Sequence, residues 1–333
     1  MPKPDAQNHP SFRWSPTMGF ILLTGIVIYL LGSTVFEAWR AHSIGGIFTA
    51  LVMIGALAAI FIEGKSLLSS PEKPVKVKPI TIIFEFLAVF LGGLLSYTFS
   101  QDLGLGAVIA ASLVAIIAYL IVPEFGIPAY CGAFVGMTSE ILLYNHLEVA
   151  VASLVAALIF VLARKVFLGV GGKLGALALI GTTVTGVGLE RTFFTTPISD
   201  WHTNSIVILI ALGAAPLTFY FNRRKGNGPV LASAVVGLTA GLIFPNLFPI
   251  KGETFAVVAI CASFTGMTSS ERCPNFWYMI LAGFFTGLIF VFSTPLLGGA
   301  GGKLGTIAFA SVLCVCGYSQ IIHRFIQWKK PKV

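Results

Sequence analysis

Long apolar runs alternate with short polar segments along nearly the whole chain. Each run approaches the roughly 20 residues that a helix needs to cross a bilayer. The runs lie at 18–36, 43–62, 80–99, 105–122, 127–143, 147–163, 174–189, 203–221, 229–244, 255–270, 275–293 and 304–322. The pattern therefore predicts an all-α polytopic membrane protein with about 12 transmembrane helices.

A second pattern is internal repetition. The string Cys-Gly-Ala-Phe-Val-Gly-Met-Thr-Ser at 131–139 returns as Cys-Ala-Ser-Phe-Thr-Gly-Met-Thr-Ser at 261–269. Gly-Val-Gly-Gly-Lys-Leu-Gly at 169–175 returns as Gly-Ala-Gly-Gly-Lys-Leu-Gly at 299–305, with the same offset of 130. Between positions 131 and 175, 18 of 45 residues are identical to their counterparts. Agreement of this extent predicts a duplicated structural unit.

The duplication divides the chain into three parts. Residues 1–79 form an N-terminal two-helix preface with a basic linker, 80–200 form the first membrane repeat, and 201–333 form the second repeat with a basic tail. Each repeat contains five expected helices. Because five is odd, the second copy enters the membrane with the opposite polarity, as in inverted-topology transporters whose helices are interrupted by glycines.

The charges of matching loops support this inversion. Gln101-Asp102 aligns with Arg223-Arg224-Lys225, whereas Arg164-Lys165 aligns with Thr294-Pro295. Basic loops stay on the cytoplasmic side, so matching loops are expected on opposite sides and both termini in the cytoplasm, with the protein in a cell inner membrane. A third helix that only re-entered the membrane would instead make the copies parallel.

Composition narrows the class of protein. The chain is 56% hydrophobic and only 10% charged, with a mean hydropathy of +0.91, whereas soluble domains carry roughly 25% charged residues. Its formal charge of +8 lies in loops and tails between apolar runs, which is typical of topology signals. We therefore expect a lipid bilayer and a small solute or ion as partners, and no nucleic acid. A homo-oligomer stays open.

The repeated Phe-x-Gly-Met-Thr-Ser string is the first candidate binding element. Non-helical backbone at membrane depth must be buried in protein or line a water-filled cavity, and a broken helix there offers carbonyls and hydroxyls to a cation or N–H groups to an anion. The alternative is helix packing through small residues and hydroxyls. The candidate residues are Gly136, Thr138, Ser139, Gly266, Thr268 and Ser269.

The glycine-lysine string that precedes each last helix is the second candidate element. Glycines before a helix present free N–H groups that favour an anion. Lysine recurs on two loops expected on opposite sides, which a topology signal alone does not explain. The lysines would stand one at each entrance or both reach a central anion; the alternative is snorkelling to the headgroups. The candidate residues are Gly171, Gly172, Lys173, Gly301, Gly302 and Lys303.

These features favour a secondary transporter that moves a small anionic solute by alternating access between the repeats. An ion channel built on the same elements and a membrane subunit or scaffold without transport are the alternatives. The sequence contains no paired carboxylates, nucleophile constellation or metal-ligand cluster, so we expect no enzyme, cofactor or metal site. Coupling to sodium or protons stays open.

Overall fold

The computed structural model describes residues 14–69, 78–223 and 228–329, and over these residues the chain is all-α. The linker at 70–77, Arg224 and Lys225, and the tail beyond residue 329 lie outside the described residues. The first helices are α1 (Trp14–Ala41), α2 (Ser43–Ser69), α3 (Pro79–Tyr97), α4 (Ala107–Ile121), α5 (Gly126–Gly136), α6 (His146–Leu162) and α7 (Lys173–Gly188). They are followed by α8 (Trp201–Arg223), α9 (Gly228–Leu247), α10 (Gly252–Gly266), α11 (Phe276–Ser293) and α12 (Lys303–Lys329).

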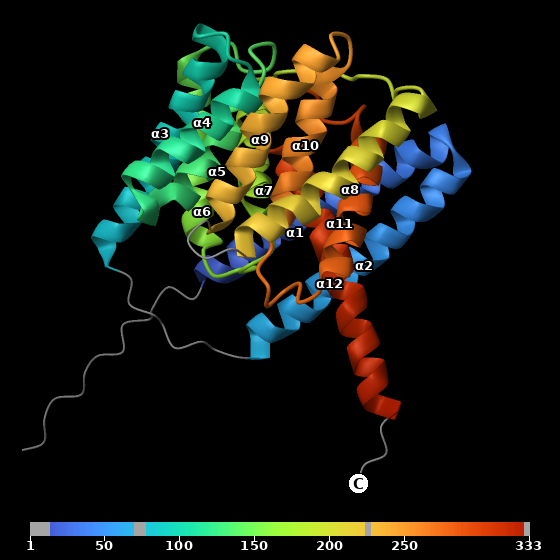
Figure 1. The fold of residues 1–333 in the computed structure, drawn as a ribbon. Helices are drawn as coiled ribbons and strands as arrows, with labels where there is room; N and C mark the ends of the chain where they lie inside the picture. Colours follow the sequence, from blue (N-terminus) through green and yellow to red (C-terminus); the bar gives the residue numbers. More distant parts are fainter. Residues whose placement is uncertain (1–13, 70–77, 224–227, 330–333) are drawn as a thin grey trace, which may run out of the picture.

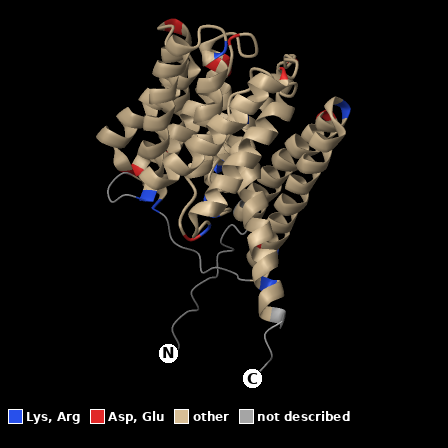
Figure 2. Ribbon diagram, turned by 45° about the vertical axis from the view of Figure 1, so that its right-hand side comes forward, with Lys and Arg blue, Asp and Glu red and all other residues tan. Residues whose placement is uncertain are grey.

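The described residues contain all twelve expected helices. Seven of them, α1, α2, α3 with its π-helical extension η1 (Thr98–Asp102), α8, α9, α11 and α12, are long and apolar enough to cross a membrane. In Figure 1, α3 and α4 lie at one side of the bundle and α2 at the opposite side. Charged residues gather mainly at the two ends of the bundle (Figure 2). By helix length and composition, the chain is a multi-pass membrane protein.

The third helix of each half is shorter than its apolar run. We expected 127–143 and 255–270, but α5 ends at Gly136 after 11 residues and α10 at Gly266 after 15. At 1.5 Å per residue these helices are about 16 and 22 Å long. Beyond each end, the hydroxyl of Thr138 donates to the Val135 carbonyl and that of Thr268 to the Thr265 carbonyl. The chain turns there, so the Met-Thr-Ser residues leave the helix although they continue the apolar run.

The helices α7 and α12 cross at two glycines. A Cβ atom added to Gly175 would lie 2.4 Å from the Gly305 Cα, and one added to Gly305 would lie 2.6 Å from the Gly175 Cα. The backbones are therefore in direct contact, as small residues permit between helices in membranes. Because this contact falls in the first turn of each helix, the two N-termini lie side by side inside the bundle.

We expect the substitution Gly305→Val to lower the melting temperature of the purified protein. Side-chain atoms placed between two touching backbones must push the helices apart, and overpacking of this kind costs about 1–3 kcal/mol. Fluorescence-detected size-exclusion chromatography after heating measures the shift. Gly213→Val is the matched control, because a Cβ there meets no atom within 4 Å. Equal melting temperatures for the two variants would contradict the close crossing.

Candidate functional site

Each threonine of the Met-Thr-Ser strings contacts the glycine string of the other half. The Gly171 N–H donates to Thr268 Oγ1 at 3.2 Å, and the Gly301 N–H donates to Thr138 Oγ1 at 3.2 Å. Both threonines are fully buried. Residues 130 positions apart thus make the same hydrogen bond with the two halves exchanged. Surfaces related by a twofold axis contact one another in this reciprocal way.

The serines repeat the exchange one residue further on. The Ser269 N–H donates to the Gly169 carbonyl at 2.9 Å, and the Ser139 N–H donates to the Gly299 carbonyl at 3.0 Å. The sequence-predicted threonines, serines and glycine-string residues therefore form one continuous structure. Many of their donors and acceptors bond to one another. Helix packing, the alternative to a binding role, therefore accounts for part of what these residues do.

Gly136 and Gly266 pack away from the glycine strings. A Cβ on Gly136 would lie 2.4 Å from the Gly93 carbonyl oxygen in α3, and one on Gly266 would lie 2.5 Å from the Ala215 carbonyl oxygen in α8. Both residues serve the close approach of neighbouring helices. Neither of these two predicted site residues lines the two cavities described below.

The last glycine before each lysine adopts a left-handed backbone. Gly172 has φ of 80° and Gly302 has φ of 87°. An added Cβ would lie 2.3 Å from the Phe309 nitrogen at Gly172 and 2.4 Å from the Leu179 nitrogen at Gly302. Only glycine meets both demands without strain. This explains why the turn into α7 and the turn into α12 share the same sequence.

The two lysines bond within their own halves. Lys173 Nζ donates to the Ala163 carbonyl at 2.8 Å. Lys303 Nζ donates to two carbonyls, those of Thr294 and Leu296. These carbonyls follow the C-terminal ends of α6 and α11, where a positive charge is favourable. An ammonium group has three donors, so Lys173 keeps more capacity for a further acceptor than Lys303 does.

A cavity of about 300 Å³ borders the first glycine string. Its wall includes Gly171, Gly172 and Lys173, which are three of the predicted site residues, and Met267 and Pro229 from the second half. Three phenylalanines from the first half complete much of the apolar wall: Phe134, Phe160 and Phe167. Both halves of the chain therefore line this cavity, and one predicted cation is on its surface.

An ion pair in the cavity wall was missed by sequence reasoning. Arg164 Nη2 lies 2.9 Å from Glu85 Oε1, and the Glu85 side chain is only 12% exposed. Glu85 Oε2 and Arg164 Nη1 are buried without a hydrogen-bond partner. In the sequence, Arg164 stands out only as a topology signal. The available clue was a carboxylate near the start of α3 and a basic residue just after α6, both on one predicted side.

The second glycine string is covered by the connection between α7 and α8. Phe194 forms an antiparallel bridge with Gly298, whose N–H donates to the Phe194 carbonyl at 3.0 Å. The Phe194 ring also lies against Gly299, where an added Cβ would be 2.5 Å from the ring. Equivalent glycine strings thus have different surroundings, since the first borders a cavity and the second lies under a loop. No sequence pattern indicated this cover.

The first glycine string is also tied to the preface. Arg272 donates through Nε to the Leu168 carbonyl at 2.9 Å. Its two terminal nitrogens each lie 3.0 Å from a Glu63 carboxylate oxygen in α2. This bidentate pair joins the preface, the first glycine loop and the turn after α10. Such a planar fork fixes geometry more strictly than a single contact.

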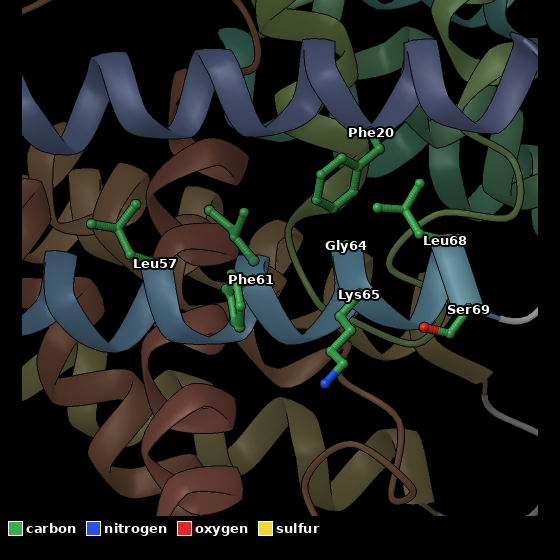
Figure 3. Close-up of a pocket in the computed structure, with 8 residues that line it drawn as sticks. Phe20, Leu57, Phe61, Gly64, Lys65, Leu68 and Ser69 are labelled. Atoms are coloured by element: carbon green, nitrogen blue, oxygen red, sulfur yellow. The ribbon is translucent and has the colours of Figure 1, made fainter.

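A larger hollow of about 770 Å³ lies between α1 and α2 (Figure 3). Phe20 points from α1 toward Gly64 of α2, and Lys65 extends away from α1. The lining is otherwise mainly apolar and contains none of the predicted site residues. We therefore take the smaller cavity at the glycine string as the candidate site. No group of three His, Cys, Asp or Glu suited to a metal occurs within the described ranges.

No family model, curated protein or solved structure matches the chain.

We expect Thr268→Val to destabilise the protein more than a threonine-to-valine change elsewhere in the core. The substitution keeps the shape but leaves the Gly171 N–H without its acceptor, which costs about 1–3 kcal/mol for a buried group. Thr34→Val is the matched control, because the equally buried Thr34 hydroxyl only donates to the Leu30 carbonyl. Melting temperatures of both purified variants measure the difference. Equal losses would argue against a structural role for the exchanged hydrogen bonds.

Proposed function

We propose that this protein is a secondary transporter that carries a small anionic solute by alternating access between two inverted five-helix repeats. One observation carries the proposal: each glycine string bonds to the threonine of the opposite half, but only the first string is shown to border a cavity, while Phe194 covers the second. Reciprocal contacts around a pseudo-twofold axis, with a ligand site where interrupted helices begin, are typical of such transporters. A cavity beside one string and a covering loop over the other are what one of two alternating states would present.

Ion pairs on one side of the bundle support the inverted arrangement. Counting twelve crossings from a cytoplasmic N-terminus puts the end of α2, the start of α3, the end of α6 and the turn after α10 all in the cytoplasm. Glu63 pairs with Arg272, and Glu85 pairs with Arg164. Both pairs thus join groups that the proposed topology places on the same side.

Two further pairs support it on the other side. Asp102 Oδ2 lies 3.0 Å from His146 Nε2, and Glu148 Oε1 lies 2.6 Å from Arg191 Nη2. The end of α3, the start of α6 and the end of α7 are all outside in the proposed topology. If the third helix of each half only re-entered the membrane, Glu85 and Arg164 would lie on opposite sides. Asp102 and His146 would be separated in the same way, whereas the other two pairs fit either arrangement.

The loop bearing Phe194 supplies the asymmetry that alternating access requires. In the proposed topology this loop is extracellular and covers the second glycine string, while the cavity at the first string faces the cytoplasm. Rocking one repeat against the other would lift Phe194 from Gly298 and close the cavity around Lys173. An equivalent cavity would then form beside Lys303.

The topology is testable with a pair of cysteines at equivalent turns. Glu140 follows α5 and Glu271 follows α10, and both side chains are exposed. All five natural cysteines are buried, so a membrane-impermeant maleimide should spare them. In intact cells we expect the reagent to label Glu140→Cys, and to label Glu271→Cys only after permeabilisation. If both cysteines were labelled from the same side, the inverted arrangement and the proposed mechanism would be refuted.

Transport is testable in proteoliposomes offered labelled chloride, sulfate, phosphate, acetate and benzoate in turn. We expect uptake of at least one anion and a loss of about tenfold or more in Lys173→Met, since the charged hydrogen-bond donor at the cavity is gone. Lys65→Met removes an exposed lysine of α2 and should keep the parent rate. Absence of uptake for every anion would refute the proposal, and discrete current steps in a planar bilayer would identify a channel instead.

A further inference from the structure

We infer that the cavity at the first glycine string binds a small organic monoanion, with a single carboxylate or sulfonate at Lys173 and an apolar body against the phenylalanines. This inference rests on the proposed transport function and names the substrate class of the same site. It goes beyond an unspecified anion because charge, size and wall chemistry each restrict the ligand.

The charge balance of the cavity favours one negative charge. Four ionisable residues line it: Glu85, Glu124, Arg164 and Lys173. Arg164 is neutralised by Glu85 at 2.9 Å, and Glu124 is exposed. Lys173 forms no ion pair with any carboxylate among the described residues, and its one side-chain hydrogen bond goes to a carbonyl. A second negative charge on the ligand would be desolvated without a partner, which is strongly unfavourable.

The size and wall of the cavity favour an organic ligand. At about 30 Å³ per water molecule, 300 Å³ holds roughly ten waters or a solute of similar volume. Phe134 and Phe167 are about 1% exposed, and Phe160 and Met267 extend the apolar surface. A hydrated inorganic anion would lose water contacts against these rings, which offer no hydrogen-bond donors in exchange. An apolar body would be stabilised by the same surface.

Donors gather at one end of the cavity, at the start of α7. The Lys173 ammonium has three donors, of which one is taken by the Ala163 carbonyl. The backbone N–H groups of Lys173 and Leu174 belong to the first turn, which has no acceptors within its own helix. Both residues line the cavity. A carboxylate has two oxygens, so this small group of donors can satisfy one such head.

The second half provides a comparison within the same chain. Lys303 opens α12 as Lys173 opens α7, but it donates to two carbonyls and lies by the glycine string that Phe194 covers. In the state described here, the ligand is therefore expected at Lys173, whose ammonium keeps more donors free than that of Lys303.

The test measures binding to the detergent-purified full chain with labelled benzoate, competed by butyrate, benzamide, chloride and sulfate. We expect butyrate to compete and the neutral amide and sulfate to fail. Lys173→Met should weaken benzoate binding by about tenfold or more. Lys173→Arg, which keeps the cation, and Lys65→Met, which removes an exposed lysine of α2, should stay within about twofold. The melting temperature of Lys173→Met, compared with that of the parent, separates loss of the ligand contact from misfolding.

Several outcomes would overturn the inference. If sulfate or chloride displaced benzoate as effectively as butyrate, the site would recognise charge alone. If benzamide competed as effectively as butyrate, the site would recognise only the apolar ring. If the benzoate affinity were unchanged in Lys173→Met, the ligand would bind elsewhere. Proteoliposomes that take up inorganic anions but bind no benzoate would refute the organic ligand and leave the transport proposal standing. Benzoate binding at Lys173 without uptake of any anion would refute transport alone.

Discussion

Direct backbone contact between Gly175 and Gly305 is the constraint on which the rest of the structure depends. Two helices can begin side by side inside the bundle only if neither presents a side chain at the crossing. Once they do, the glycine strings that precede them must lie next to the Met-Thr-Ser turns of the opposite half, where the exchanged hydrogen bonds satisfy their N–H groups. The cavity beside Lys173 lies next to this crossing, because the first glycine string forms part of its wall.

Most of the helical architecture could be predicted from the sequence, because hydropathy and length decide where a chain crosses lipid. The ends of α5 and α10 could not, since Met137 and its neighbours are apolar enough to continue a helix and leave it only through the turn that threonine stabilises. Likewise, the repeat identified the right strings but not the contacts between them. The contacts of Glu85, Arg164 and Phe194 arise from tertiary packing, which no local sequence pattern predicts.

Duplicated sequence does not give duplicated chemistry here. Arg164 aligns with Thr294, so only the first half has a guanidinium beside its glycine string, and only the second string lies under Phe194. The glycines that both halves share form the helix crossing, and residues that differ, such as Arg164, influence which glycine string is accessible. The cavity therefore depends partly on residues that differ between the halves, whereas the helix crossing depends on glycines that both halves share.

The bidentate pair between Glu63 and Arg272 connects the preface to the second half of the chain. The preface also packs closely on α12, where Tyr318 donates to the Leu51 carbonyl at 2.6 Å and Gly317 touches the Gly55 carbonyl. Excising the first two helices would remove the bidentate partner of Arg272 and uncover the face of α12 that packs on α2. The ten helices that follow the preface are thus not self-contained in this structure, because the turn after α10 depends on a carboxylate that only α2 supplies among the described residues.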